Sequence, residues 1–75
     1  MPKLPRIPSS LVLKTLKRAG FYEYHQTGSH VQLRHFVYKN LRITIPVSRK
    51  ELTPKTLKTI IKQADLTVEE FIDLL

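Results

Sequence analysis

The fold of this chain is decided by residues 26–46, which read QTGSHVQLRHFVYKNLRITIP. Apolar and polar side chains alternate over residues 30–35 and again over residues 41–45, as they do in strands that bury one face. Thr27-Gly28 precedes the first alternating run, and Tyr38-Lys39-Asn40 separates it from the second. Glycine and asparagine accept the backbone angles of tight turns, so both segments are predicted turns. Two strands joined by a short loop are therefore expected here.

A third predicted strand precedes this stretch, because residues 21–26 are rich in side chains that favour strands. Three strands joined by short turns are expected to form an antiparallel meander. The alternation turns Val31 and Leu33 toward a core, and His35 toward the core side or the strand edge. The opposite, polar face of the sheet is then expected to carry His30, Gln32, Arg34, Arg42 and Thr44.

A helix is predicted before the strands. Residues 10–19 have apolar side chains at helical spacing, with Ser9 or Ser10 as the N-cap and Gly20 as the residue that ends the helix. Before it, prolines at every third position predict an extended proline-rich arm over residues 1–8, because each proline restricts the backbone.

Two more helices are predicted after the strands. Thr53-Pro54 is a helix-start sequence, and an apolar stripe follows it at helical spacing. Thr67 and Glu70 have the spacing of a capping box, which predicts a short acidic helix within residues 65–75. The exposed stripe of the first of these two helices is expected to consist of Lys55, Lys58 and Lys62.

The predicted order of elements is α-β-β-β-α-α, with helices on one face of a three-stranded antiparallel sheet and the other face open. This α+β layout is that of double-stranded-RNA-binding domains. A chain of 75 residues is long enough for one compact domain, so residues 1–75 are expected to form a single domain.

Charge and composition narrow the classes of function. The chain has 13 Lys and Arg against 6 Asp and Glu, a formal charge of +7 and a pI near 10.1. Residues 1–64 hold all 13 basic residues and only Glu23 and Glu51, which leaves +11. A segment with this excess of positive charge is an electrostatic match for a phosphate backbone or for an acidic protein partner. There is no cysteine and no apolar run of membrane-span or signal-peptide length, so we expect a cytoplasmic protein that binds no membrane.

A single histidine is the strongest candidate for chemistry. The histidines at 25, 30 and 35 are spaced so that they fall on different faces or strands, and no metal site or cofactor is expected. His30 follows the predicted turn of Gly28 and Ser29 and begins a strand near solvent. An imidazole there can transfer a proton near neutral pH.

RNA is a substrate that such a site suits. Its 2′-hydroxyl is an internal nucleophile, so the protein need supply only proton transfer and positive charge. Three classes stay open: a ribonuclease, a non-catalytic RNA-binding module of the same fold, and a protein that binds an acidic partner. The candidate RNA contacts are Arg34, Arg42, Lys39, Lys55, Lys58 and Lys62.

Seven segments of the chain form a recognisable series. They are Met1-Pro2-Lys3-Leu4-Pro5, Leu16-Lys17-Arg18-Ala19-Gly20-Phe21, Gln26-Thr27-Gly28-Ser29-His30-Val31, Thr44-Ile45-Pro46, Glu51-Leu52-Thr53-Pro54, residues 56–64 and residues 66–71. In this order and spacing they resemble the HicA family, the small RNA-cleaving toxins of type II toxin–antitoxin pairs. The similarity extends over nearly the whole chain.

The resemblance implies a double-stranded-RNA-binding-like fold, cleavage of mRNA, and neutralisation by an acidic antitoxin of the HicB type. It also implies that His30 is the catalytic histidine. Two positions depart from the family pattern. Many relatives have a second histidine just after the proline that ends the third strand, where this chain has Val47-Ser48, and many have a glycine where this chain has Lys55. The second proton-transfer group is therefore unassigned, with His25 or a lysine as candidates.

Overall fold

A three-stranded sheet and three helices form the body of the structure, a computed structural model that describes residues 4, 6–47 and 51–75. The elements in chain order are β1 (Ile7–Pro8), α1 (Ser9–Arg18), β2 (Phe21–Thr27), β3 (His30–His35), β4 (Arg42–Pro46), β5 (Glu51–Leu52), α2 (Pro54–Gln63) and α3 (Val68–Leu74). The predicted α+β layout is confirmed: the sheet has the antiparallel order β2-β3-β4, compatible with a small double-stranded-RNA-binding-like fold.

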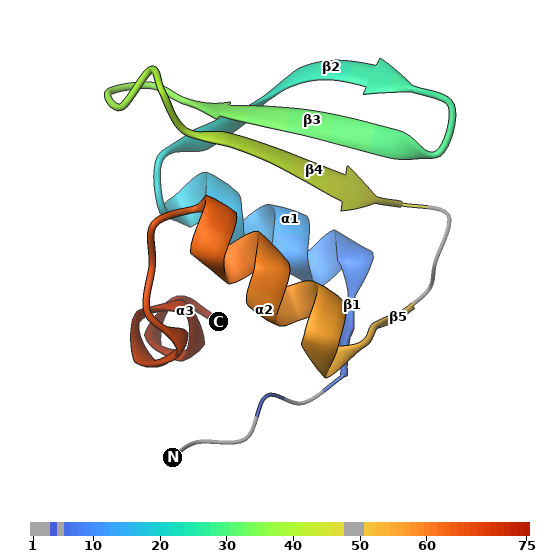
Figure 1. Cartoon of the computed structure of the whole chain (residues 1–75), viewed down its shortest axis with the longest axis vertical. Coiled ribbons are helices and arrows are strands. Elements are labelled where there is room, and N and C mark those ends of the chain that lie inside the picture. The colour runs from blue at the N-terminus through green and yellow to red at the C-terminus, as the bar shows by residue number, and fades with distance from the viewer. Residues whose placement is uncertain (1–3, 5, 48–50) are drawn as a thin grey trace.

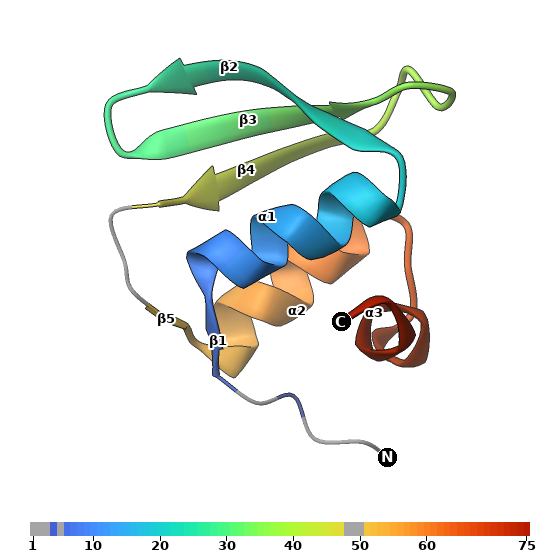
Figure 2. The same cartoon turned by 180° about the vertical axis from the view of Figure 1, so that it is seen from behind.

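The helices all lie on one side of this sheet (Figures 1 and 2). Helices α1 and α2 run beneath it, and α3 packs against both of them farther from the strands. The core lies between these layers, where the alternating residues of β3 and β4 meet the apolar stripes of the helices. Its fully or nearly fully buried members are Ile7, Val12, Leu16, Phe21, Val31, Leu33, Ile43, Ile45, Leu52, Leu57, Ile60, Ile61, Ala64 and Phe71.

The helix ends follow the sequence signals, with one exception. Thr53 accepts a hydrogen bond from the Thr56 N–H at the start of α2, and Thr67 and Glu70 form both bonds of the predicted capping box. Gly20, at φ +101°, ends α1 as predicted. The predicted serine cap is wrong: α1 begins at Ser9, its N-cap is Pro8, and no side chain caps it.

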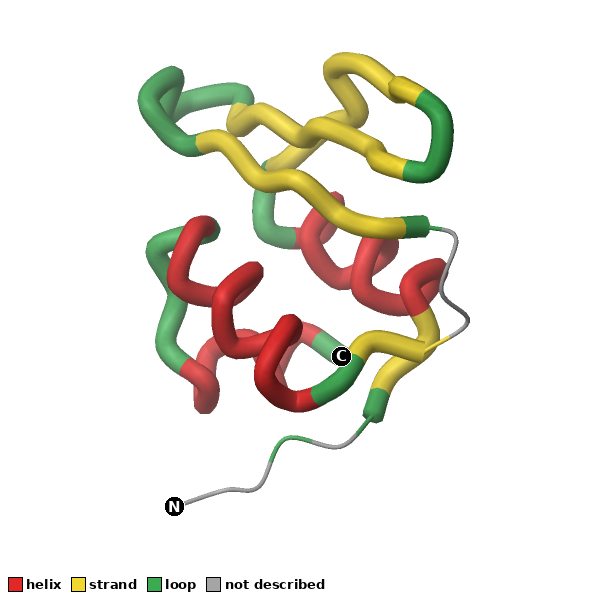
Figure 3. The backbone as a smooth tube through the Cα atoms, turned by 45° about the vertical axis from the view of Figure 1, so that its right-hand side comes forward, coloured by secondary structure: helices red, strands yellow, loops and turns green. Residues whose placement is uncertain are grey.

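A short second sheet joins two distant parts of the chain. Ile7 pairs with Leu52 and Pro8 with Glu51, antiparallel, and both apolar members of this ladder are buried. The tube view shows the two strands together beside the helices (Figure 3). Strands of two residues have no alternation to read, which is why the sequence predicts neither of them. The predicted arm thus contributes a strand at its end, while residues 1–3 and 5 lie outside the described residues.

The pairing of β2 with β3 contains a bulge. Glu23 pairs with Leu33, but the next pair is His25 with Gln32, so Tyr24 is one extra residue in β2. An extra residue changes which side chains face each side of the sheet after it. Beyond the bulge, His25 therefore shares the face of Gln32, and Thr27 shares that of His30.

Candidate functional site

His30 begins β3, the central strand of the sheet. The turn before it consists of Gly28 and Ser29, with Gly28 at φ +56°, a left-handed angle that glycine adopts without strain. His30 pairs with Thr27 on one side and Pro46 on the other, so both neighbouring strands fix its backbone. Its side chain is exposed on the face that no helix covers. The imidazole is therefore available to a ligand on that open face.

Ser29 lies close to the ring of His30. Its Oγ is 3.3 Å from His30 Nδ1, within hydrogen-bond distance. Ser29 belongs to the turn, as predicted, rather than to the strand, so strand alternation does not separate the two side chains. A hydroxyl at Nδ1 orients the ring and leaves Nε2 as the nitrogen that can act on a substrate.

Two arginines share the open face with His30. Arg34 of β3 and Arg42 of β4 are direct cross-strand partners. The guanidinium of Arg34 also stacks on Tyr24 of the bulge, with Cζ 4.0 Å from the ring centroid, a cation–π contact that holds the charge in place. The sequence-predicted His30, Arg34 and Arg42 thus lie on one face, with His30 at the start of β3 and the two arginines at the other end of the β3–β4 pairing.

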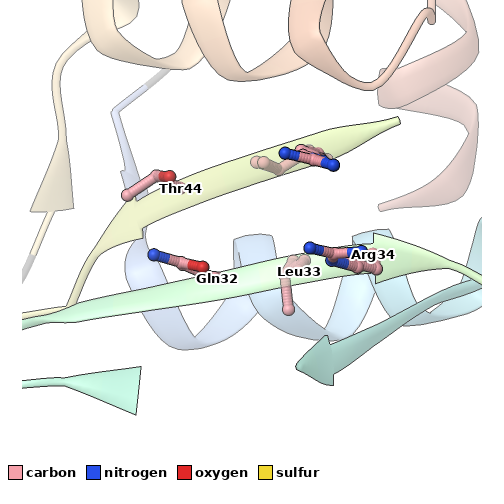
Figure 4. Close-up of a pocket in the computed structure, with 6 residues that line it drawn as sticks. Gln32, Leu33, Arg34 and Thr44 are labelled. Carbon is pink, nitrogen blue, oxygen red and sulfur yellow. The ribbon is translucent and has the colours of Figure 1, made fainter. Parts of the chain in front are cut away.

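A shallow hollow of about 210 Å³ lies between β3 and β4 on this face. Figure 4 shows Gln32 and Thr44 on facing strands at one end of it and Arg34 toward the other. Arg42, Ile43 and Leu33 complete its lining, and Leu33 points away toward the helices. The hollow therefore offers hydrogen-bonding groups beside two positive charges.

His35 has a structural position. It is only 8% exposed, as its predicted core-side orientation requires. Its Nδ1 accepts bonds from the N–H groups of Val37 and Tyr38 at 3.0 and 3.1 Å, so its Nε2 donates to the Ala19 carbonyl at 2.9 Å. These bonds use both nitrogens to join the end of α1 to the loop after β3, which leaves neither free for a substrate.

Aromatic side chains gather at one end of the open face. Tyr22 of β2 and Phe36 after β3 have ring centroids 4.6 Å apart, and Phe36 is 63% exposed. Tyr24, also on β2, is 54% exposed, and Tyr38 is exposed in the loop after β3. These residues are not predicted as site residues from the sequence, because aromatic side chains in strands ordinarily belong to the core.

Carboxylates lie elsewhere in the described part of the chain. Glu23 is turned to the helix side, where it forms a 2.9 Å ion pair with Lys17 of α1. The other acidic residues belong to β5, to the loop before α3, or to α3 itself. Within residues 4, 6–47 and 51–75, no group of three or more His, Cys, Asp or Glu is placed to hold a metal ion. The charge of the open face comes from its arginines.

A sequence model of the HicA toxins of bacterial toxin–antitoxin systems matches residues 9–66, most of the chain. The chain belongs to the HicA toxin family. The match covers α1, the whole three-stranded sheet and α2, and therefore includes His30 and both arginines. No curated protein matches the chain. Membership in this family implies an antitoxin as partner.

The remaining candidate residues of this HicA-family chain lie away from His30. Lys39 is exposed in the loop between β3 and β4. Lys55, Lys58 and Lys62 are exposed on α2, which lies on the opposite side of the sheet from the open face. Ser48, at the position near which many relatives have a second histidine, lies outside the described residues. None of the described helices is long and apolar enough to cross a membrane.

Proposed function

We propose that this HicA-family chain is a metal-independent endoribonuclease that cleaves mRNA, with His30 as a proton-transfer group. The observation that carries the proposal is the position of His30: exposed, fixed at the start of the central strand, on the same face as Arg34 and Arg42. An exposed imidazole on the same face as two guanidiniums is equipped for phosphodiester chemistry.

The chemistry requires little from the protein. The 2′-oxygen attacks the adjacent phosphorus and the bond to the 5′-oxygen breaks, so one proton must leave the 2′-hydroxyl and one must reach the leaving oxygen. His30 Nε2 carries out one of these transfers, and Arg34 and Arg42 stabilise the negative charge that develops on the phosphate. DNA has no 2′-hydroxyl and is not cleaved by this route.

RNA binding rests on charge and on aromatic rings. The +7 charge attracts the phosphate backbone, and the proposed phosphate contacts are Arg34, Arg42, Lys39, Lys55, Lys58 and Lys62. Tyr22, Tyr24 and Phe36 present ring surfaces on which unpaired bases can stack. This combination favours a single-stranded segment of mRNA as the ligand.

The partner of the toxin is proposed to be an acidic, HicB-type antitoxin. The open face carries arginines, and within the described residues the carboxylates lie elsewhere, so an acidic surface complements it. An antitoxin that covers His30 would prevent access of RNA to the site.

The His30→Ala variant tests the enzymatic proposal. We expect it to lose RNA cleavage by about 10²–10⁴-fold and to lose growth inhibition, while it folds and binds RNA like the parent. Lys14→Ala, an exposed change on α1, is the matched control and should cleave at the parental rate. Cleavage by the parent should also survive excess EDTA.

The alternative function is a non-catalytic RNA-binding module of the same fold. Parental cleavage by His30→Ala would favour that alternative, because the exposed imidazole would then have no role in chemistry. Loss of activity in EDTA that one divalent ion restores would instead indicate metal catalysis and contradict the proton-transfer mechanism.

A further inference from the structure

His25 shares the open face with His30, and the bulge in β2 is the reason. His25 pairs with Gln32 and Thr27 pairs with His30, so both histidines belong to one side of the β2–β3 ladder. Both side chains are exposed. Tyr24 is the extra residue that sets this register, and its ring contacts Arg34 on the same face.

The two imidazoles are diagonal neighbours. His25 stands two residues before Thr27, the direct partner of His30. Diagonal positions across an antiparallel pair are about 7–8 Å apart, within reach of aromatic and long side chains. Two rings mounted in this way can approach one phosphodiester group from two directions.

From this juxtaposition we propose that His25 is the second catalytic residue, which completes a pair of histidines that transfer the two protons of RNA cleavage. This inference rests on the proposed function. One imidazole, in its neutral form, accepts the proton of the 2′-hydroxyl as the bond between the 2′-oxygen and phosphorus forms. The other, in its protonated form, donates a proton to the 5′-oxygen as its bond to phosphorus breaks.

The step is balanced without another reactant. One proton is taken up and one is released, and the products are a 2′,3′-cyclic phosphate and a free 5′-hydroxyl. Among residues 4, 6–47 and 51–75, the other titratable and charged groups of this face are Tyr22 and Tyr24 on β2, Arg34 on β3 and Arg42 on β4. A limb of the pH profile is therefore assigned to a histidine by its loss in the corresponding alanine variant.

The test compares three variants on two substrates. The variants are His25→Ala, His30→Ala and the control Gln26→Ala, which is next to His25 but pairs with the buried Val31 on the helix side. The first substrate is an oligoribonucleotide whose cleavage position has been mapped with the parent. The second has sulfur in place of the bridging 5′-oxygen at that position, and a thiolate leaves without being protonated.

We expect His25→Ala to lose about 10²–10⁴-fold in kcat/KM on the ordinary RNA while Gln26→Ala stays at the parental rate. The parent should show a bell-shaped pH profile, and His25→Ala should lose one limb of it. One of the two histidine variants should recover on the sulfur substrate, and that variant lacks the acid. An RNA with a 2′-deoxy sugar at the mapped position binds but cannot be cleaved. The affinity of both histidine variants for this RNA should match that of the parent.

Two results would overturn the pairing. One is cleavage by His25→Ala at the parental rate, with His30→Ala inactive. The other is a slow His25→Ala variant that keeps both limbs of the pH profile, with no recovery of either variant on the sulfur substrate. Both leave His30 as a catalytic group, whereas a parent protein that cleaves no RNA would refute the proposed function itself.

Discussion

At the scale of single residues, Gly20 and His35 are fitted to each other. A Cβ added to Gly20 would lie 2.6 Å from His35 Nε2, the atom that donates to Ala19. Gly20 also has φ +101°, an angle that side-chain-bearing residues rarely adopt. Gly28 has φ +56° as well, but no atom lies within 4 Å of its added Cβ.

This difference predicts unequal costs for the same substitution. Gly20→Ala should reduce the free energy of unfolding by about 2–4 kcal/mol, from backbone strain together with displacement of the imidazole. Gly28→Ala carries the strain alone and should cost about 1–2 kcal/mol. Urea unfolding of both variants measures the difference, and equal costs would mean that the contact with His35 yields without penalty.

The single residues of the site differ in how well the sequence predicts them. His30, Arg34 and Arg42 are predicted correctly on the open face because β3 and β4 alternate strictly. In such strands, every second side chain faces the same side of the sheet. Ser29 is correctly predicted in the turn, but its contact with His30 is not, because alternation does not extend into a turn. His35 is predicted to lie toward the core side or the strand edge, and the structure places it on the core side with three hydrogen bonds that the sequence does not predict.

At the scale of elements, helix caps are local and bulges are not. The Thr67–Glu70 capping box joins residues three apart, so a sequence pattern can predict it. The bulge at Tyr24 depends on how β2 pairs with β3, and the residues of β2 do not alternate clearly. For that reason the sequence names His25 only as one candidate for the second proton-transfer group, and the face on which it lies could not be predicted.

The lysine stripe of α2 gives a prediction at this scale. We expect Lys55, Lys58 and Lys62, replaced together by Gln, to weaken RNA binding and reduce the salt dependence of affinity by up to about two in log–log slope. The rate at which bound RNA is cleaved should not change, because α2 lies on the other side of the sheet from the open face. Filter binding over a salt series and single-turnover cleavage measure the two quantities.

Lys14→Gln on α1 is the control for a simple loss of charge. An unchanged slope in the triple variant would mean that these lysines only solvate the helix, as exposed helical residues usually do. A slower single-turnover cleavage rate would mean that α2 binds the RNA and positions it at His30.

At the scale of the whole molecule, charge is divided along the chain. Every basic residue lies within residues 1–64, while residues 65–75 contain four acids and no base. The two parts are nevertheless joined, because Arg18 of α1 donates to the Leu74 carbonyl at the end of α3. Composition predicts this polarity, but which face the positive charge occupies depends on the register of the sheet.

The position of the charge leads to a prediction about the antitoxin. A partner that inhibits by complementarity should cover the open face, so His25 and His30 should react with diethyl pyrocarbonate in the free toxin and be protected in the complex. His35 should be protected in both, since it is buried and bonded at both nitrogens. Mass spectrometry of the toxin, alone and with the protein encoded by the adjacent reading frame, gives the three levels of modification.

Association should also slow as salt increases, because opposite charges steer the encounter. A stable complex in which His30 still reacts fully would mean that the antitoxin inhibits from another surface, and the lysine-bearing side of α2 would then be the surface to examine for a blocked RNA path.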